Sequence, residues 1–151
     1  MPFPPSSGMT LALAEARAAA ARGEVPVGAV VLAADGSLLA ATGNRTLELS
    51  DPTAHAEMLA IRAAATLSGS PRLTGCSLYV TLEPCAMCAG AIAAARVARL
   101  VYGASDPKSG GVEQGARVFA HPQAHHCPEI VAGIAEAEAA ALLRDFFATR
   151  R

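Results

Sequence analysis

Two cysteines, Cys85 and Cys88, stand three residues apart directly after a proline. On a helix this spacing places both side chains on one face, one turn apart, so that both sulfurs can bind a single metal ion. A position in the first turn also favours the thiolate, because the helix dipole is positive there. The pair alone fits equally well half of a four-cysteine structural site or a redox dithiol.

The other two cysteines and one histidine argue against both of these kinds of site. Cys76 and Cys127 are far apart in the sequence and do not form the second pair that a four-cysteine site needs. The order of predicted elements also differs from that of thioredoxin-like proteins. Taken alone, His55 at a predicted helix start is more often a surface or capping residue, but beside Cys85 and Cys88 it is the candidate third ligand. Three protein ligands leave the fourth position open, as in catalytic zinc sites, so we expect one Zn²⁺ per chain.

Glu57 follows His55 by two residues. Two thiolates and a neutral imidazole cancel the charge of Zn²⁺, so a hydroxide can still form from its water, whose pKa zinc lowers to about 7. Glu57 suits a proton shuttle that takes a proton from this water and delivers it to a substrate ring nitrogen and then to leaving ammonia. The alternative is a first-turn acid that only complements the helix dipole. The sequence therefore predicts Glu57 as the catalytic residue of a hydrolytic deamination.

The hydrophobic pattern predicts an α/β fold. Predicted helices cover 10–22, 53–68, 84–96 and 135–149, and predicted strands cover 25–32, 38–42, 77–81 and 99–102. Asp35-Gly36 between the first two strands is a hairpin signal. The segment 103–128 is rich in Gly, Pro and His and gives no clear assignment. This order predicts a three-layer α/β/α sandwich with a central mixed sheet.

Composition limits the classes of protein that the chain can belong to. With 151 residues, 52 % apolar and 17 % charged, it fits one folded domain, which we expect over 9–151 after a flexible tail at 1–8. The start has no signal-peptide pattern and no apolar run reaches the roughly 18 residues of a membrane span, so we expect a cytoplasmic protein without a membrane partner. A net charge of −1 means that any RNA partner must bind a local patch.

A family resemblance joins these motifs. His55-Ala56-Glu57 followed by Pro84-Cys85-Ala86-Met87-Cys88 resembles the H-x-E and P-C-x-x-C signature of zinc nucleobase deaminases. Segments at 24–30, 43–45, 51–57, 78–85 and 142–147 extend the resemblance to bacterial tRNA-specific adenosine deaminases over nearly the whole chain. The resemblance implies a cytidine-deaminase-like fold, a homodimer, and conversion of the wobble adenosine of an arginine tRNA to inosine.

The same resemblance implies substrate contacts around the pocket. Pro26 and Val27 would line the base pocket, and Asn44 would hydrogen-bond the flipped nucleotide. Asp106 and Lys108 match a loop that handles neighbouring nucleotides, although this loop departs from the commonest form in the family.

At the C-terminal end, Phe146, Phe147 and Arg150 match a helix that flanks the RNA. Simple core packing is the alternative for one of the two phenylalanines. Many family members have an Asn-His pair where this chain has His125-His126. These departures concern the nucleotide contacts rather than the chemistry.

Two alternatives stay open on the residues alone. A deaminase of a free base or nucleoside (guanine, cytosine or adenosine) would share the metal ligands and Glu57, but would not need the Asp106 loop or the end of the chain. A zinc-stabilised RNA-binding domain without catalysis would have no use for Glu57 and would normally close the fourth zinc position.

Overall fold

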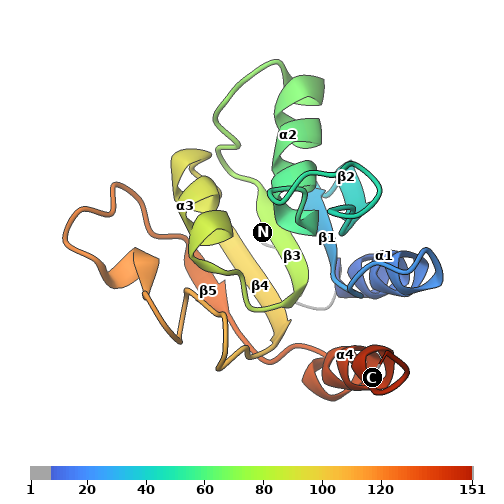
Figure 1. Cartoon of the computed structure of the whole chain (residues 1–151). Coiled ribbons are helices and arrows are strands. Elements are labelled where there is room, and N and C mark those ends of the chain that lie inside the picture. The colour runs from blue at the N-terminus through green and yellow to red at the C-terminus, as the bar shows by residue number, and fades with distance from the viewer. Residues whose placement is uncertain (1–7, 151) are drawn as a thin grey trace.

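The computed structural model describes residues 8–150, and the seven residues before them, with Arg151, lie outside the described part. Helices and strands alternate along the chain (Figure 1). The helices are α1 (Met9–Ala21), α2 (Ala56–Ser68), α3 (Ala86–Ala94) and α4 (Glu136–Ala148), with a short 3₁₀ helix η1 at Val118–Ala120. The strands are β1 (Gly28–Leu32), β2 (Leu38–Gly43), β3 (Ser77–Leu82), β4 (Arg99–Ala104) and β5 (Glu129–Val131).

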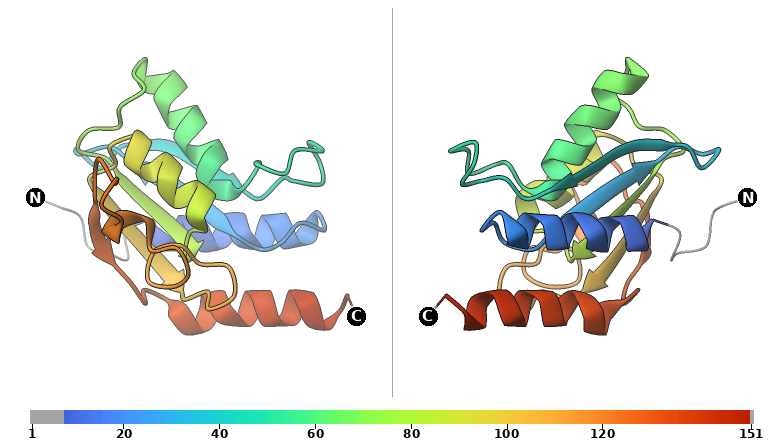
Figure 2. Two further views of the ribbon diagram at one scale, coloured as in Figure 1. Left: turned by 60° about the vertical axis from the view of Figure 1, so that its left-hand side comes forward. Right: turned by 90° about the vertical axis from the view of Figure 1, so that its right-hand side faces the viewer.

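The strands form one mixed sheet in the order β2-β1-β3-β4-β5. β1 is antiparallel to β2 and β3, whereas β3, β4 and β5 are parallel. Helices α1 and α4 cover one face of the sheet, and α2 and α3 cover the other (Figure 2). The predicted three-layer α/β/α sandwich is therefore confirmed.

Alanine-rich helix faces let the helices lie close to the sheet. Helix α2 buries Ala56, Ala60 and Ala64 against the core that includes Val31 and Leu78. Without large side chains between them, the backbones of helix and strand approach closely, which fixes the positions of the helix starts. This close layering places the N-terminal ends of α2 and α3 on the same face of the sheet.

Two helices begin later than the sequence predicted. The predicted helix at 53–68 begins at Ala56, because Asp51 Oδ1 accepts hydrogen bonds from the N–H and hydroxyl of Thr53 and forms a turn there. The predicted helix at 84–96 begins at Ala86 and ends at Ala94, so Pro84 is not in its first turn. The residues before the helices, His55 and Cys85, are N-cap residues with extended backbone.

One strand begins later than predicted, and two short elements were not predicted. The predicted strand at 25–32 begins only at Gly28, because the N–H of Val27 bonds back to the carbonyl of Val25 and turns the chain away from the sheet. Neither η1 nor β5 was predicted from the sequence. Both are three residues long, too short to show a hydrophobic period.

The start of the described chain packs on the sheet. Of the predicted tail at 1–8, residues 1–7 lie outside the described residues, and Gly8 is the N-cap residue of α1. A Cβ on Gly8 would lie 2.4 Å from the ring of Tyr79, so a residue without a side chain fits there. Among the described helices, none is both long enough and apolar enough to cross a membrane.

Candidate active site and metal centre

Three candidate ligands meet at the starts of α2 and α3. His55 and Cys85 are the N-cap residues of these two helices, with ψ angles of 153° and 174°. Neither side chain caps its own helix, so both are available for other contacts. Cys88 is the third residue of α3 and is buried. The structure therefore brings together the three residues that the spacing selected.

The distances among these atoms suit a zinc ion. His55 Nδ1 lies 3.7 Å from Cys85 Sγ and 3.5 Å from Cys88 Sγ, and the three donor atoms lie within 4.8 Å of one another. Bonds of about 2.3 Å to sulfur and about 2.0 Å to nitrogen at a tetrahedral ion would separate N and S by about 3.5 Å. One imidazole and two thiolates are also donors that zinc prefers. The donor set thus fits zinc in both chemistry and size.

Hydrogen bonds link the three candidate ligands to one another. Hydrogen bonds from Cys88 and His55 lower the pKa of Cys85 to about 3, so its thiolate forms readily. The hydrogen bond to Cys85, together with burial, raises the pKa of Cys88, and the hydrogen bond to Cys85 also raises the pKa of His55. A metal ion that binds both thiolates and a neutral imidazole would release the protons that these groups hold.

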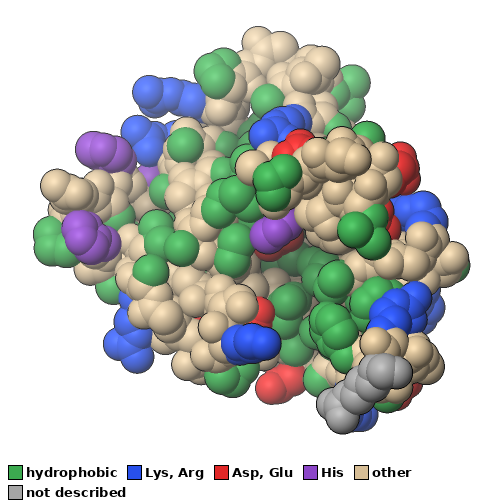
Figure 3. All heavy atoms as spheres, viewed as in Figure 1, with side chains coloured by type: hydrophobic (Ala, Val, Ile, Leu, Met, Phe, Trp, Pro, Cys, Tyr) green, Lys and Arg blue, Asp and Glu red, His purple; other side chains and the backbone are tan. Residues whose placement is uncertain are grey.

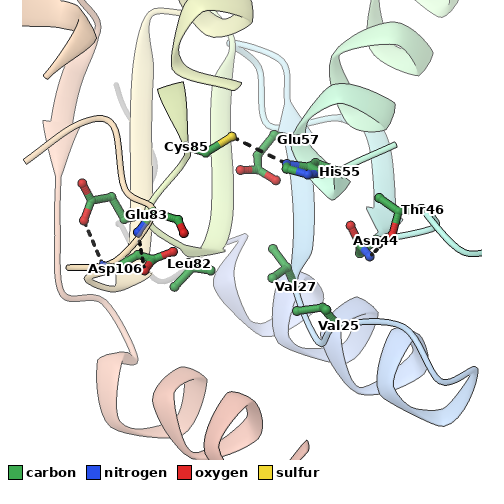
Figure 4. Close-up of a pocket in the computed structure, with 11 residues that line it drawn as sticks. Val25, Val27, Asn44, Thr46, His55, Glu57, Leu82, Glu83, Cys85 and Asp106 are labelled. Atoms are coloured by element: carbon green, nitrogen blue, oxygen red, sulfur yellow. Dashed lines mark hydrogen bonds between the residues drawn. The ribbon is translucent and has the colours of Figure 1, made fainter. Parts of the chain in front are cut away.

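Glu57 lies in the first turn of α2 and is only 4 % exposed. Burial raises the pKa of its carboxyl group to about 7. In Figure 4 the carboxyl group points into the space between His55 and Cys85. An acid with a pKa near neutrality can both accept and donate a proton at the ligand cluster, which is what a proton shuttle requires.

Two of the ligands, His55 and Cys85, line a pocket together with Glu57. It has a volume of about 200 Å³, smaller than the 300–1,000 Å³ typical of sites for drug-sized ligands. The volume suits a group the size of one base. The pocket is lined by Val25, Val27, Asn44, Thr46, His55, Glu57, Leu82, Glu83, Cys85, Asp106 and Ser109. In the space-filling view, hydrophobic side chains border a hollow with a histidine side chain at its edge (Figure 3).

Three of the predicted substrate residues line this pocket: Val27, Asn44 and Asp106. Asn44 is 7 % exposed. Pro26 and Lys108, in contrast, are not among the lining residues, and Lys108 is exposed on the loop beside Asp106.

The C-terminal helix lies apart from the pocket lining. Phe146 is 8 % exposed, and the guanidinium of Arg150 stacks over its ring at 3.7 Å from the centroid. Phe147 meets Phe146 edge to face at 5.3 Å and is 50 % exposed. Phe146 is therefore buried in the fold, whereas Phe147 and Arg150 are exposed at the surface outside the pocket lining.

The sequence did not single out five lining residues: Val25, Thr46, Leu82, Glu83 and Ser109. A usable signal existed for Glu83, an acid between a predicted buried strand and the Pro-Cys of the metal motif. Burial would raise the pKa of Glu83, but hydrogen bonds from the backbone N–H groups of Asp106, Gln114, Val112 and Glu113 outweigh it and lower the pKa. Its role depends on a loop far along the chain, which no local pattern reveals.

An α/β/α sandwich that joins one histidine, two cysteines and a buried glutamate at two helix starts defines the class of zinc nucleobase deaminases. The family model of the cytidine and deoxycytidylate deaminase zinc-binding region matches residues 5–104. The chain therefore belongs to this family of zinc-dependent deaminases.

One curated relative and two solved structures are similar to the chain over most of its length. The chain is 57 % identical to the tRNA-specific adenosine deaminase of Agrobacterium fabrum over 95 % of this chain and 93 % of that protein. A structure from a study of A-to-I editing by tRNA:A34 deaminases at the wobble position matches with a TM-score of 0.87 and 56 % identity, over 89 % and 97 % of the two chains. The guanine deaminase of Nitrosomonas europaea matches with a TM-score of 0.82 and 26 % identity, over 98 % and 86 %.

Proposed function

We propose that the chain deaminates adenosine to inosine at the wobble position of tRNA. The observation that carries this proposal is the three-ligand cluster with Glu57, open to a base-sized pocket, in a chain that is 57 % identical to a tRNA-specific adenosine deaminase. An anticodon base is already exposed in a loop, so extruding it costs less than extruding a base from a duplex. The pocket therefore has room for one base, and an anticodon base can enter it without first leaving a duplex.

His55, Cys85 and Cys88 would hold one zinc ion per chain. When bound, zinc supplies a Lewis acid that lowers the pKa of a coordinated water. Glu57 accepts a proton from the attacking water and delivers it to N1 of adenine. Glu57 then takes the remaining proton from the oxygen that has added to C6 and gives it to the amino group; the C6–N bond breaks as the C6 carbonyl forms, so that adenosine and water give inosine and ammonia.

Around the reacting base, Val27 would contact the ring and Asn44 would hydrogen-bond the flipped nucleotide. Asp106 stands on the opposite side of the pocket (Figure 4). Pro26, which is buried directly before Val27 in the sequence, would support this wall, and Lys108, exposed on the loop with Asp106, would contact a neighbouring phosphate.

The exposed C-terminal end of α4 and the residues directly after it would contact the RNA outside the pocket. Phe147 offers a half-exposed ring, and Arg150 a cation within one turn of it. An aromatic ring can stack on an unpaired base, and an arginine can bind phosphate. Phe146, which is buried, would support these two residues rather than touch RNA.

We further propose an arginine tRNA as the substrate, a homodimer as the assembly and the cytoplasm as the location. The first two rest on the resemblance to the bacterial tRNA-specific adenosine deaminases. The cytoplasmic location is inferred from the similarity to tRNA-specific adenosine deaminases, since these enzymes are named as acting on tRNA. Light scattering of the purified protein tests the assembly, since a mass near twice that of one chain is expected.

The decisive experiment gives the zinc-loaded protein four substrates side by side: an arginine tRNA anticodon stem-loop, adenosine, guanine and cytosine. Inosine in the RNA and released ammonia are measured. Deamination of the stem-loop with little turnover of the small substrates is expected. Turnover of guanine alone would instead favour the activity of the structurally similar guanine deaminase.

A further inference from the structure

Besides Glu57, two more buried carboxylates lie in or next to the pocket lining. They are Glu24 and Glu83, and each is 2 % exposed. Within residues 8–150 neither forms an ion pair. A buried carboxylate is tolerated only when its oxygens accept hydrogen bonds, and those to backbone N–H groups are among the stronger ones. Each of these carboxylates accepts such bonds from one loop of the pocket wall.

Glu83 binds the loop that follows β4. Its Oε1 accepts the N–H of Asp106 at 2.9 Å and the hydroxyl of Ser105 at 3.3 Å. Its Oε2 accepts three consecutive N–H groups at 2.9 to 3.1 Å, those of Val112, Glu113 and Gln114. One side chain therefore ties both ends of the segment 105–114 to the end of β3.

Two glycines let this loop come so close. A Cβ on Gly110 would lie 2.5 Å from Cδ of Glu83, and a Cβ on Gly111 would lie 2.5 Å from the backbone nitrogen of Ala86. The N–H of Gly111 also donates to the carbonyl of Pro84 at 2.8 Å. The loop is thus packed against the carboxylate and against the start of the helix that carries the cysteine ligands.

Glu24 binds the opposite loop in the same manner. Its Oε1 accepts the N–H of Leu47 at 3.1 Å and the amide Nδ2 of Asn44 at 3.3 Å, and its Oε2 accepts the N–H of Glu48 at 2.8 Å. Asn44 Nδ2 also donates to Thr46 at 3.3 Å. The orientation of the Asn44 side chain, which lines the pocket, is therefore fixed through Glu24.

We propose that Glu24 and Glu83 are positioning residues that hold the two opposite walls of the pocket in place before the substrate arrives. Figure 4 shows these walls, with Asn44 on one side, Asp106 on the other, and Glu57 between them. Walls that are already ordered reduce the entropy lost on binding, and small misplacements of substrate-positioning groups reduce rates steeply. The inference rests on the proposed function, because it assigns the walls to the recognition of the flipped nucleotide.

The first test measures the loops directly. Glu24→Gln and Glu83→Gln replace one acceptor oxygen by an amide that donates, so it faces N–H groups unfavourably. Amide hydrogen exchange is followed in the zinc-loaded protein. Exchange should accelerate about tenfold or more over 105–114 in Glu83→Gln only, and over 44–48 in Glu24→Gln only, since local opening governs exchange. Each variant is the control for the other.

The second test measures the consequence for the substrate. Both variants should keep their zinc, while kcat/KM for the anticodon stem-loop falls about tenfold or more, mostly through a higher KM. Val101→Ala, which trims a buried side chain on the sheet face covered by α1 and α4, lowers stability but should leave both loops and KM unchanged. Glu129→Gln makes the same chemical change at an exposed site and should have no effect.

A further variant covers the case in which Glu83→Gln does not fold. Gly110→Ala keeps the carboxylate and pushes the loop away from it, so the same accelerated exchange and raised KM are expected. Unchanged exchange in both loops, or accelerated exchange with unchanged KM, would overturn the inference. If the wild-type chain does not deaminate the stem-loop at all, the proposed function fails instead, and the exchange data still report whether the carboxylates hold the loops.

Discussion

At the scale of single residues, Glu57 has the sharpest expected effect. It is buried beside the ligands without being one of them, so Glu57→Ala should keep zinc and lose activity. Loss of a proton shuttle typically lowers the rate by about 10² to 10⁴-fold. Inosine formation and metal content measure the two properties separately. Glu129→Ala, at an exposed carboxylate, is the matched control, and a Glu57→Ala variant with wild-type kcat would remove Glu57 from the mechanism.

The metal ligands could be predicted from sequence because their spacing is local. Cys85 and Cys88 are three residues apart at the start of α3, and His55 is the N-cap residue of α2, so the short spacing of the cysteine pair indicated a shared ligand position even though Cys85 itself precedes the helix. Glu83, in contrast, obtains its role from backbone groups more than twenty residues away. Such a contact depends on how the chain folds back, and a single sequence does not encode it in any period or motif.

At the scale of elements, the contact of α1 with β1 depends on one glycine. A Cβ on Gly28 would lie 1.9 Å from the carbonyl oxygen of Ala12 and 2.7 Å from the nitrogen of Ala16, both backbone atoms. Gly28→Ala should therefore separate helix and strand and lower the free energy of unfolding by about 1–3 kcal/mol or more. Urea unfolding measures this change.

The matched control for Gly28→Ala is Gly90→Ala, also a glycine in a regular element. Apart from its chain neighbours and the backbone of its own helix α3, no atom lies within 4 Å of a Cβ at Gly90. Alanine there should leave the unfolding midpoint unchanged or raise the stability by about 0.5–1 kcal/mol, because glycine weakens helices. Equal midpoints for the two variants would contradict the close helix–strand contact.

Most elements were predictable because they show a clear period, and their ends were not. Helices α1 and α4 lie within one residue of their predicted bounds. The shifted starts of α2 and α3 come from the extended backbone of His55 and Cys85, which a propensity argument does not include. The order of strands in the sheet follows from long-range pairing, so β5 at the edge could be placed only from the structure.

At the scale of the whole molecule, zinc would link two helices across one face of the sheet. Its removal by a chelator should lower the melting temperature, because a ligand that binds only the folded state stabilises it by about 2.7 kcal/mol at a hundredfold excess over Kd. Calorimetry with and without chelator measures the shift. In Cys85→Ser the chelator should no longer lower the melting temperature. In Cys127→Ser, at an exposed cysteine outside the cluster, the chelator should still lower it. A chelator without effect on the wild type would contradict a bound metal.

The net charge of −1 means that RNA binding depends on local cations rather than on the field of the whole molecule. Binding of the anticodon stem-loop should weaken as salt rises, by roughly 0.7 to 0.9 log units in Kd per log unit of salt for each phosphate contact. Lys108→Ala, on the exposed loop beside the pocket, should reduce this slope by about one contact. Arg72→Ala removes an exposed cation beyond the end of α2 opposite to His55 and should leave the slope unchanged. If the wild type, Lys108→Ala and Arg72→Ala show equal slopes of log Kd against log salt, the phosphate contacts lie away from Lys108. The RNA would then have to approach the pocket from another side.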